Sequence, residues 1–190
     1  MADFPVLKIS YFAVAVLTMG LMIAGSCLPS FMDIHADQKR LHIVTAEVGI
    51  WQICNKAGSG SVCLKYADTR LGVPFPSMVK SAQGCNVVAL LSFAALIVTS
   101  VVIERCDVHR AVLLVPRVLA SCSAIFMIAT AGLMVHFVEK EFEAPFGLEI
   151  LKDPGTGGII AVVSILSAIV SIVLAHCTHS RVPSGLYQSL

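Results

Sequence analysis

Charged residues are scarce in this chain. Only 13% of its 190 residues are Asp, Glu, Lys or Arg, whereas soluble proteins carry about a quarter. The 13 basic residues nearly balance the 12 acidic ones, which leaves a formal net charge of +1. Without a basic field to attract phosphates, nucleic acid is not expected as a partner. Internal repeats, coiled-coil heptads and low-complexity segments are missing too, so one compact unit is expected.

Sequence signatures of enzymes are also missing. The chain has no Ser/His/Asp arrangement, no phosphate-binding glycine loop and no HExxH motif. The centres of its apolar runs carry no Asp, Glu or Lys, which argues against a proton-coupled pump or transporter. His35 and His42 have no ligand spacing with other His or Cys residues, so no metal site is predicted. We therefore expect a protein that is not an enzyme and that uses no cofactor.

Hydrophobic sequence, by contrast, is abundant. Hydrophobic residues make up 57% of the chain, and its mean hydropathy is +0.87. Four long apolar runs cover about residues 9–28, 78–103, 111–138 and 156–177. Each is near or above the roughly 20 residues that a helix needs to cross a bilayer. A soluble domain of this length has too little polar surface to bury all four runs. The sequence therefore predicts an all-α membrane protein, a left-handed four-helix bundle with the lipid bilayer as solvent.

Cysteines indicate the orientation better than charge does. The first apolar run is expected to stay on the protein as a signal-anchor. Basic residues occur both in the short turn after the second run and in the loop 29–77. The usual excess of Lys and Arg in cytosolic loops therefore does not decide which loops are cytosolic. Cys54 and Cys63 both lie in this loop, and a disulfide between them requires an oxidising compartment. Both termini are then cytosolic, and the loops 29–77 and 139–155 face outward.

The first of these loops is expected to form a small antiparallel sheet. Residues 41–54 are rich in alternating aliphatic and β-branched side chains, which predicts one strand. The Gly/Ser-rich segment 56–61 predicts a hairpin turn, and residues 62–66 predict the return strand.

Two cysteines flank the predicted hairpin symmetrically. Cys54 precedes the turn and Cys63 follows it, so the two side chains can face each other and form a disulfide. The second external loop, 139–155, is short and acidic. The sheet is therefore expected from the first loop alone.

A motif inside the first loop resembles the signature of a known family. Gly49-Ile50-Trp51 is followed by Cys54 and then, nine positions later, by Cys63. This Gly-Ile-Trp-x-x-Cys-x8-Cys stretch is similar to the Gly-Leu-Trp-x-x-Cys-x8–10-Cys signature of claudins. Peripheral myelin proteins and calcium-channel gamma subunits share the signature more loosely. The segments on both sides of the motif, and the ends of the second apolar run, are similar to claudins as well.

The resemblance implies a function at the cell surface. A claudin-like protein would lie in the plasma membrane or at a cell junction and would form an adhesion contact, a paracellular barrier or a channel. It would do so by associating with further copies of itself, both side by side and across the gap between cells. The alternative is an auxiliary subunit that docks onto a larger channel, receptor or membrane complex, or a divergent tetraspan surface protein.

Particular residues are expected to carry this function. Phe31 stands where claudins have a tryptophan after the first span, and we expect it to act as an anchor in the membrane interface. Trp51 is expected to pack between the sheet and the bundle, with an interfacial position as the alternative. In claudins the position just after the second cysteine helps set the charge of the ion path. Here Leu64 and Lys65 follow Cys63, and because neighbouring strand residues alternate, one of them can face such a path.

Three residues are singled out on the cytosolic side. Arg117 lies near the start of the third run, and its long side chain can reach the inner membrane interface as an anchor. Cys106 and Cys177 lie at cytosolic span ends and are candidates for palmitoylation.

Overall fold

Four long helices form the body of the molecule. The computed structural model describes residues 3–38, 41–57, 60–66, 77–105, 112, 114–141 and 149–180. The helices are α1 (Asp3–Cys27), α2 (Ser77–Arg105), α3 (Val115–Glu141) and α4 (Thr156–Ser180). All four are long and apolar enough to cross a membrane, which confirms the predicted four-helix membrane protein. The handedness of the bundle stays a prediction.

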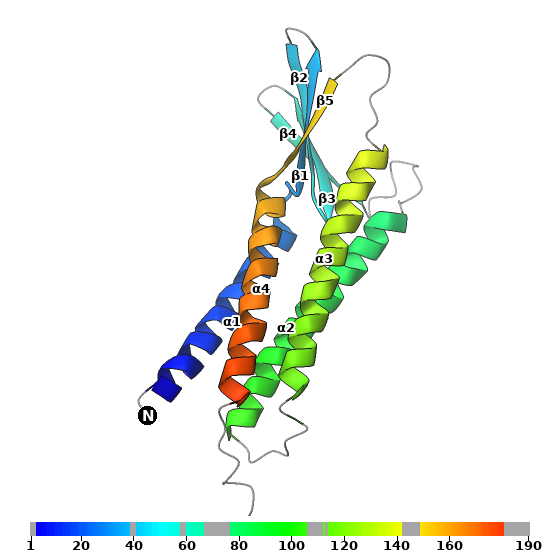
Figure 1. Cartoon of the computed structure of the whole chain (residues 1–190). Helices are drawn as coiled ribbons and strands as arrows, with labels where there is room; N and C mark the ends of the chain where they lie inside the picture. The colour runs from blue at the N-terminus through cyan, green and yellow to red at the C-terminus, as the bar shows by residue number, and fades with distance from the viewer. Residues whose placement is uncertain are drawn as a thin grey trace, which may run out of the picture.

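A sheet of five antiparallel strands stands at one end of the bundle (Figure 1). Its strands are β1 (Met32–Gln38), β2 (Leu41–Val48), β3 (Gln52–Ala57), β4 (Gly60–Lys65) and β5 (Glu149–Pro154). They are ordered β4-β3-β2-β1-β5. We call the end of the bundle that carries the sheet the sheet end.

The predicted sheet is therefore correct in its hairpin and wrong in its extent. The segment 41–54 is not one strand, because the chain turns at residues 49–51 and forms β2 and β3. The hairpin of β3 and β4 is confirmed, and its tip, residues 58–59, lies outside the described residues. The loop 139–155 also contributes a strand, because β5 pairs with β1. The loop between α1 and α2 and the loop between α3 and α4 thus enter one sheet.

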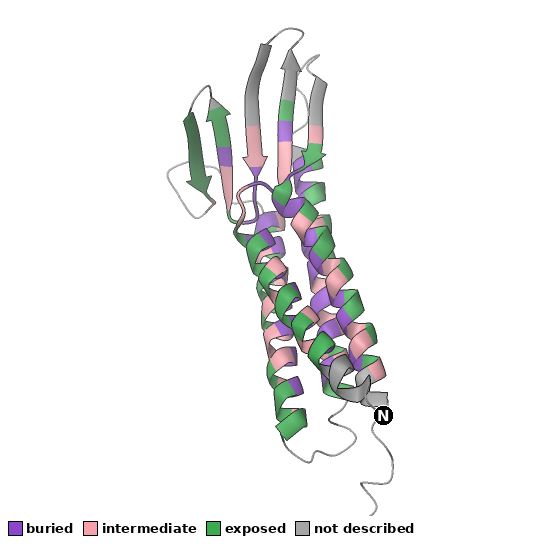
Figure 2. Ribbon diagram, turned by 90° about the vertical axis from the view of Figure 1, so that its left-hand side faces the viewer, coloured by how far each residue is buried: buried purple, intermediate pink, exposed green. Residues whose placement is uncertain are grey.

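The helices associate most closely as two pairs, α1 with α4 and α2 with α3 (Figure 1). Hydroxyl groups join them across the interior. The Tyr11 hydroxyl lies 2.8 Å from Ser100 Oγ and links α1 to α2, while Ser123 Oγ donates to the carbonyl of Ala89 at 2.9 Å and links α3 to α2. Many buried residues of the bundle are small or hydroxylic, and many large aliphatic residues are exposed. Buried and exposed residues alternate along each helix (Figure 2). This pattern suits a bundle whose solvent is lipid.

Candidate functional site: the sheet and its junction with the bundle

The signature turn, residues 49–51, fastens the sheet to the bundle. All three of its backbone carbonyls accept hydrogen bonds: that of Gly49 from the Tyr66 hydroxyl at 3.1 Å, that of Ile50 from Gln83 Nε2 at 3.0 Å, and that of Trp51 from the Tyr66 backbone N–H at 3.3 Å. Because Gln83 belongs to α2, the turn is held against the first turns of that helix. The claudin-like motif is thus a structural joint at the sheet end.

Glycine is required at the start of this turn by close packing. A Cβ atom at Gly49 would lie 2.6 Å from the carbonyl oxygen of Pro29. This is far closer than two such atoms can approach, so any side chain would push the turn away from the segment that leads from α1 into β1. The Gly49 backbone N–H also donates to the Gln52 carbonyl at 2.9 Å, which closes the turn.

Trp51 is more exposed than predicted, and Phe31 is more buried than predicted. Trp51 is 40% exposed, whereas its neighbour Ile50 is only 2% exposed and enters the core. The prediction that the indole packs between sheet and bundle is therefore wrong, because the turn aims Ile50 inward and Trp51 outward. The position of the turn beside α2 favours the alternative, an interfacial tryptophan.

Phe31 is only 3% exposed and belongs to the hydrophobic core. Its backbone N–H donates to the Val48 carbonyl at 2.9 Å, and its own carbonyl accepts from Gly155 at 3.1 Å. The prediction of a membrane-interface anchor is therefore wrong for Phe31. Two neighbouring backbone segments bind it on either side, so the ring fills the joint instead of reaching lipid.

Tyr66 completes the joint, and the sequence indicated only its place at the end of the predicted return strand. Its ring packs edge-on against Phe137 of α3, with ring centroids 6.5 Å apart. Burial raises the pKa of the Tyr66 phenol above its ordinary value, so the hydroxyl stays protonated and donates to Gly49. Gln83 was equally unforeseen, because one amide in an apolar run resembles a surface residue.

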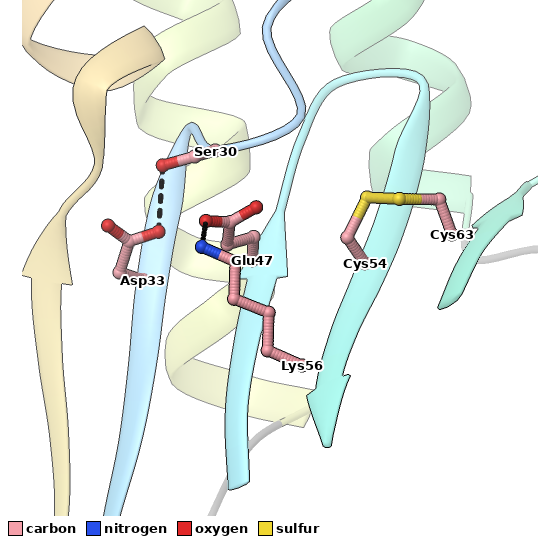
Figure 3. A network of polar contacts seen from close by, with 6 residues as sticks. All are labelled: Ser30, Asp33, Glu47, Cys54, Lys56 and Cys63. Atoms are coloured by element: carbon pink, nitrogen blue, oxygen red, sulfur yellow. Dashed lines mark hydrogen bonds and ion pairs between the residues drawn. A yellow bond between two sulfur atoms is a disulfide. The ribbon is translucent and has the colours of Figure 1, made fainter. Parts of the chain in front are cut away.

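A disulfide joins Cys54 and Cys63, which confirms the predicted bond. The two residues are direct cross-strand partners in β3 and β4, as the symmetrical hairpin required (Figure 3). Cys54 is buried, while the whole of β4 is exposed. The bond therefore fastens an exposed edge strand to the rest of the sheet.

The sheet has one apolar and one polar face. The apolar face carries Ile34 and Val48, which belong to the core. The register places one row of residues side by side on the polar face, in the order Asp153, Asp33, Glu47, Cys54 and Cys63. Like charges directly opposite each other destabilise a sheet, so this row needs neutralising partners.

Two contacts supply part of this compensation (Figure 3). Ser30 Oγ donates to Asp33 Oδ1 at 2.7 Å, and Lys56 Nζ forms an ion pair with Glu47. The hydrogen bond to Glu47 raises the pKa of the Lys56 ammonium, so Lys56 is charged at neutral pH. These carboxylates lie on β1, β2 and β5, and their alignment was not visible in the sequence.

Leu64 and Lys65 both lie on β4 and are exposed. Leu64 is the partner of Ile53 and Lys65 that of Gln52, so they point to opposite faces, as predicted. Lys65 shares the polar face with Cys63. The role of either residue in an ion path stays a prediction.

Arg117 and Cys177 lie at the end of the bundle opposite the sheet. Arg117 is half-buried in the first turn of α3, and its Nε atom is buried without a hydrogen-bond partner. Cys177 is half-buried near the end of α4. Cys106 lies outside the described residues. The anchoring and palmitoylation roles stay predictions. Among the described residues, no group of three His, Cys, Asp or Glu side chains could hold a metal ion.

Comparison with known proteins adds no relative. No protein-family model matches the chain, and no curated protein is significantly similar to it.

Proposed function

We propose that this chain is a claudin-like membrane protein without enzymatic activity that acts in cell–cell adhesion or in a paracellular barrier. Its sheet would face the extracellular space of the plasma membrane or a cell junction, and both termini would lie in the cytosol. It would associate with further copies laterally and across the gap between cells. The bundle would be left-handed.

One observation carries this proposal. The loop between α1 and α2 and the loop between α3 and α4 enter a single sheet, which a disulfide braces and which projects from the end of the bundle. A rigid extracellular platform is a suitable contact surface, because little conformational entropy is lost when such a surface binds. The claudin-like motif supports the proposal further, because its Gly49 and Ile50 build the joint that holds the platform.

Freeze-fracture microscopy of cells that express the chain alone tests the proposal. We expect continuous intramembrane strands in cells that otherwise lack them. The matched control is the double variant Cys54→Ser with Cys63→Ser, whose loosened hairpin should yield fewer strands at equal surface expression. Dispersed particles for the wild-type chain, together with purification in one large complex, would reject adhesion by self-association.

An auxiliary-subunit role is the second candidate, and one observation favours it. Gly20, Gly84 and Gly132 are exposed on three different helices, and a Cβ atom at each would meet nothing within 4 Å. No packing within the chain therefore requires them, while small residues do allow a foreign helix to approach closely. If the chain is an auxiliary subunit, substituting all three glycines with leucine should abolish copurification of a larger partner. If the chain acts by self-association, the same substitutions should leave the intramembrane strands of the freeze-fracture test intact.

Selectivity would distinguish a channel from a barrier. If Lys65 faces an ion path, anions should be preferred, and Lys65→Glu should reverse the preference in a salt-dependent way because exposed charges are screened within about 8–10 Å. Dilution potentials across monolayers measure this. Equal potentials for wild type and variant at matched expression would favour the barrier.

A further inference from the structure

The sheet has two outer strands, β4 and β5. Within the described residues, β4 pairs with β3 alone and β5 pairs with β1 alone, so each has a backbone edge without a strand partner. All six residues of β4 are exposed, including Val62 and Leu64. Natural proteins usually protect such edges with prolines, bulges or many charges. The strand β4 has no proline, and its one charge, Lys65, lies at its end, so it is the unprotected edge. The strand β5 has three charged residues and Pro154 at its end, so its contact depends on complementary charge.

The two outer strands run in the same direction. Every adjacent pair in the order β4-β3-β2-β1-β5 is antiparallel. Four reversals separate β4 from β5, so the two strands are parallel. Both run toward the bundle, since β5 leads directly into α4 and the end of β4 is bound at the signature turn.

We propose that β4 of one copy pairs in parallel with β5 of a neighbouring copy in the same membrane. The inference rests on the lateral self-association of the proposed function and names the surface that performs it. The alternative of two β4 strands paired antiparallel would turn one copy upside down, because the strands stand roughly along the helix axes (Figure 1). Pairing β4 with β5 keeps both bundles upright and side by side.

Charge complementarity selects these two edges. Along the polar face, the row that begins at Asp153 ends at Cys63. In the register that continues this row unbroken from one copy to the next, Cys63 of one copy lies beside Asp153 of its neighbour. Lys65 is two residues from Cys63 on the same face, within reach of the neighbouring Asp153 carboxylate. Lys65 and Asp153 are both exposed and carry opposite charges.

The dimensions of the two layers also agree. Five strands at about 4.8 Å spacing repeat every ~24 Å. Two helices of about 10–12 Å diameter side by side occupy ~20–24 Å. Sheets paired edge to edge thus leave room for one bundle beneath each sheet. Because the contact joins two different surfaces, a pair of copies still has one unpaired β4 and one unpaired β5, so further copies can add to form a row.

Zero-length cross-linking of the full chain in liposomes tests this contact. Unlabelled and ¹⁵N-labelled copies are mixed in detergent, reconstituted, and treated with a carbodiimide, which joins a lysine to a carboxylate only in direct contact. We expect linked peptides between Lys65 of one isotopic form and Asp153 of the other. A link within one copy is excluded, because four strand spacings of about 4.8 Å separate the two residues.

Charge reversal supplies the second measurement. Lys65→Glu or Asp153→Lys alone should lower self-association by fluorescence transfer roughly fivefold, in line with an exposed ion pair turned repulsive. The double variant Lys65→Glu with Asp153→Lys should restore it and restore the link between positions 65 and 153. Lys140→Glu, an exposed lysine at the end of α3, is the matched control and should have no effect.

Two outcomes would overturn the inference, and they can be told apart. Self-association of the wild-type chain without the mixed-isotope link, and without any response to charge reversal, rejects this contact and leaves the proposed function standing. Absence of any self-association of the wild-type chain rejects both. An intact Cys54–Cys63 disulfide in each variant verifies that the sheet has folded.

Discussion

The helix bundle and the sheet differ in which side chains they bury. In the bundle, many buried positions hold small or polar residues such as Ala89 and Thr130, beside larger ones such as Phe93, and most large aliphatic residues lie outside. In the sheet, Ile34 and Val48 are buried and the charged residues lie outside. The comparison shows that the residue types suited to exposed positions depend on whether the surrounding solvent is water or lipid. Lipid removes the hydrophobic drive between helices, so close packing and hydrogen bonds must hold them together.

The largest effect is expected where the two regions meet. Ile50→Ala should lower the free energy of unfolding by about 2–5 kcal/mol, the usual cost of emptying a buried aliphatic site. Trp51→Ala should cost clearly less, because the indole is already 40% exposed. Thermal unfolding of both variants in detergent measures the difference. A larger loss for Trp51→Ala would mean that the joint depends on the indole.

Two residues of equal exposure sharpen the comparison directly. Leu91, at the middle of α2, is 65% exposed, and Val62 in β4 is 66% exposed. Leu91→Arg should cost about 2.5–3.5 kcal/mol, because an arginine at the centre of a span must enter lipid. Val62→Arg should cost almost nothing, because its surroundings are water. Membrane insertion efficiency and surface yield of the two variants report this contrast, and equal yields would contradict the assignment of α2 to the membrane.

The disulfide should matter for the sheet and not for the bundle. Removing it by Cys54→Ser with Cys63→Ser should destabilise the sheet by about 2–3 kcal/mol, because the disulfide lowers the conformational entropy of the unfolded chain. Cys122→Ser, at a free and half-buried cysteine of α3, serves as the control. Hydrogen exchange of β3 and β4 measures the effect. Faster exchange throughout α3 as well would show that the two regions unfold together.

The smallest effect is expected at the ion pair of Lys56 and Glu47. Since this pair raises the pKa of Lys56, the stability that it contributes is present below the ordinary lysine pKa of about 10.4 and is lost as pH rises through the raised value. Lys56→Gln should therefore be slightly less stable than wild type at pH 7, and the difference should vanish in strong alkali. Melting curves across this pH range measure it. A difference that grows with pH would refute the assignment.

The sequence predicted those parts of the molecule that local patterns determine. Long apolar runs require helices, and a Gly/Ser turn between cysteines at matched positions requires a hairpin. The strands β1 and β5 were missed because charged residues such as Asp33 and Asp153 weaken the strand signal, and only pairing over a long sequence distance forms them.

The joint shows the same limit at the level of single residues. Composition marks Phe31 and Trp51 as two large aromatics beside a membrane, yet one is buried and the other is exposed. The direction of a turn decides this, and the turn at Gly49 depends on how closely Pro29 approaches it. The close contact between Gly49 and Pro29 exists only in the assembled fold, and neither sequence segment alone predicts it.

The neighbouring strands β1 and β5 have a mechanical consequence. One continues into α1 through residues 28–31, and the other into α4 through Gly155 alone. Backbone hydrogen bonds tie the two connections together, from Gly155 to Phe31 and from Gly157 to Ser30 at 2.6 Å. Tension on the sheet would therefore load the pair of α1 and α4 directly. The two tied connections form a short, stiff tether on one side of the bundle, and force applied to the sheet would travel along it into these two helices.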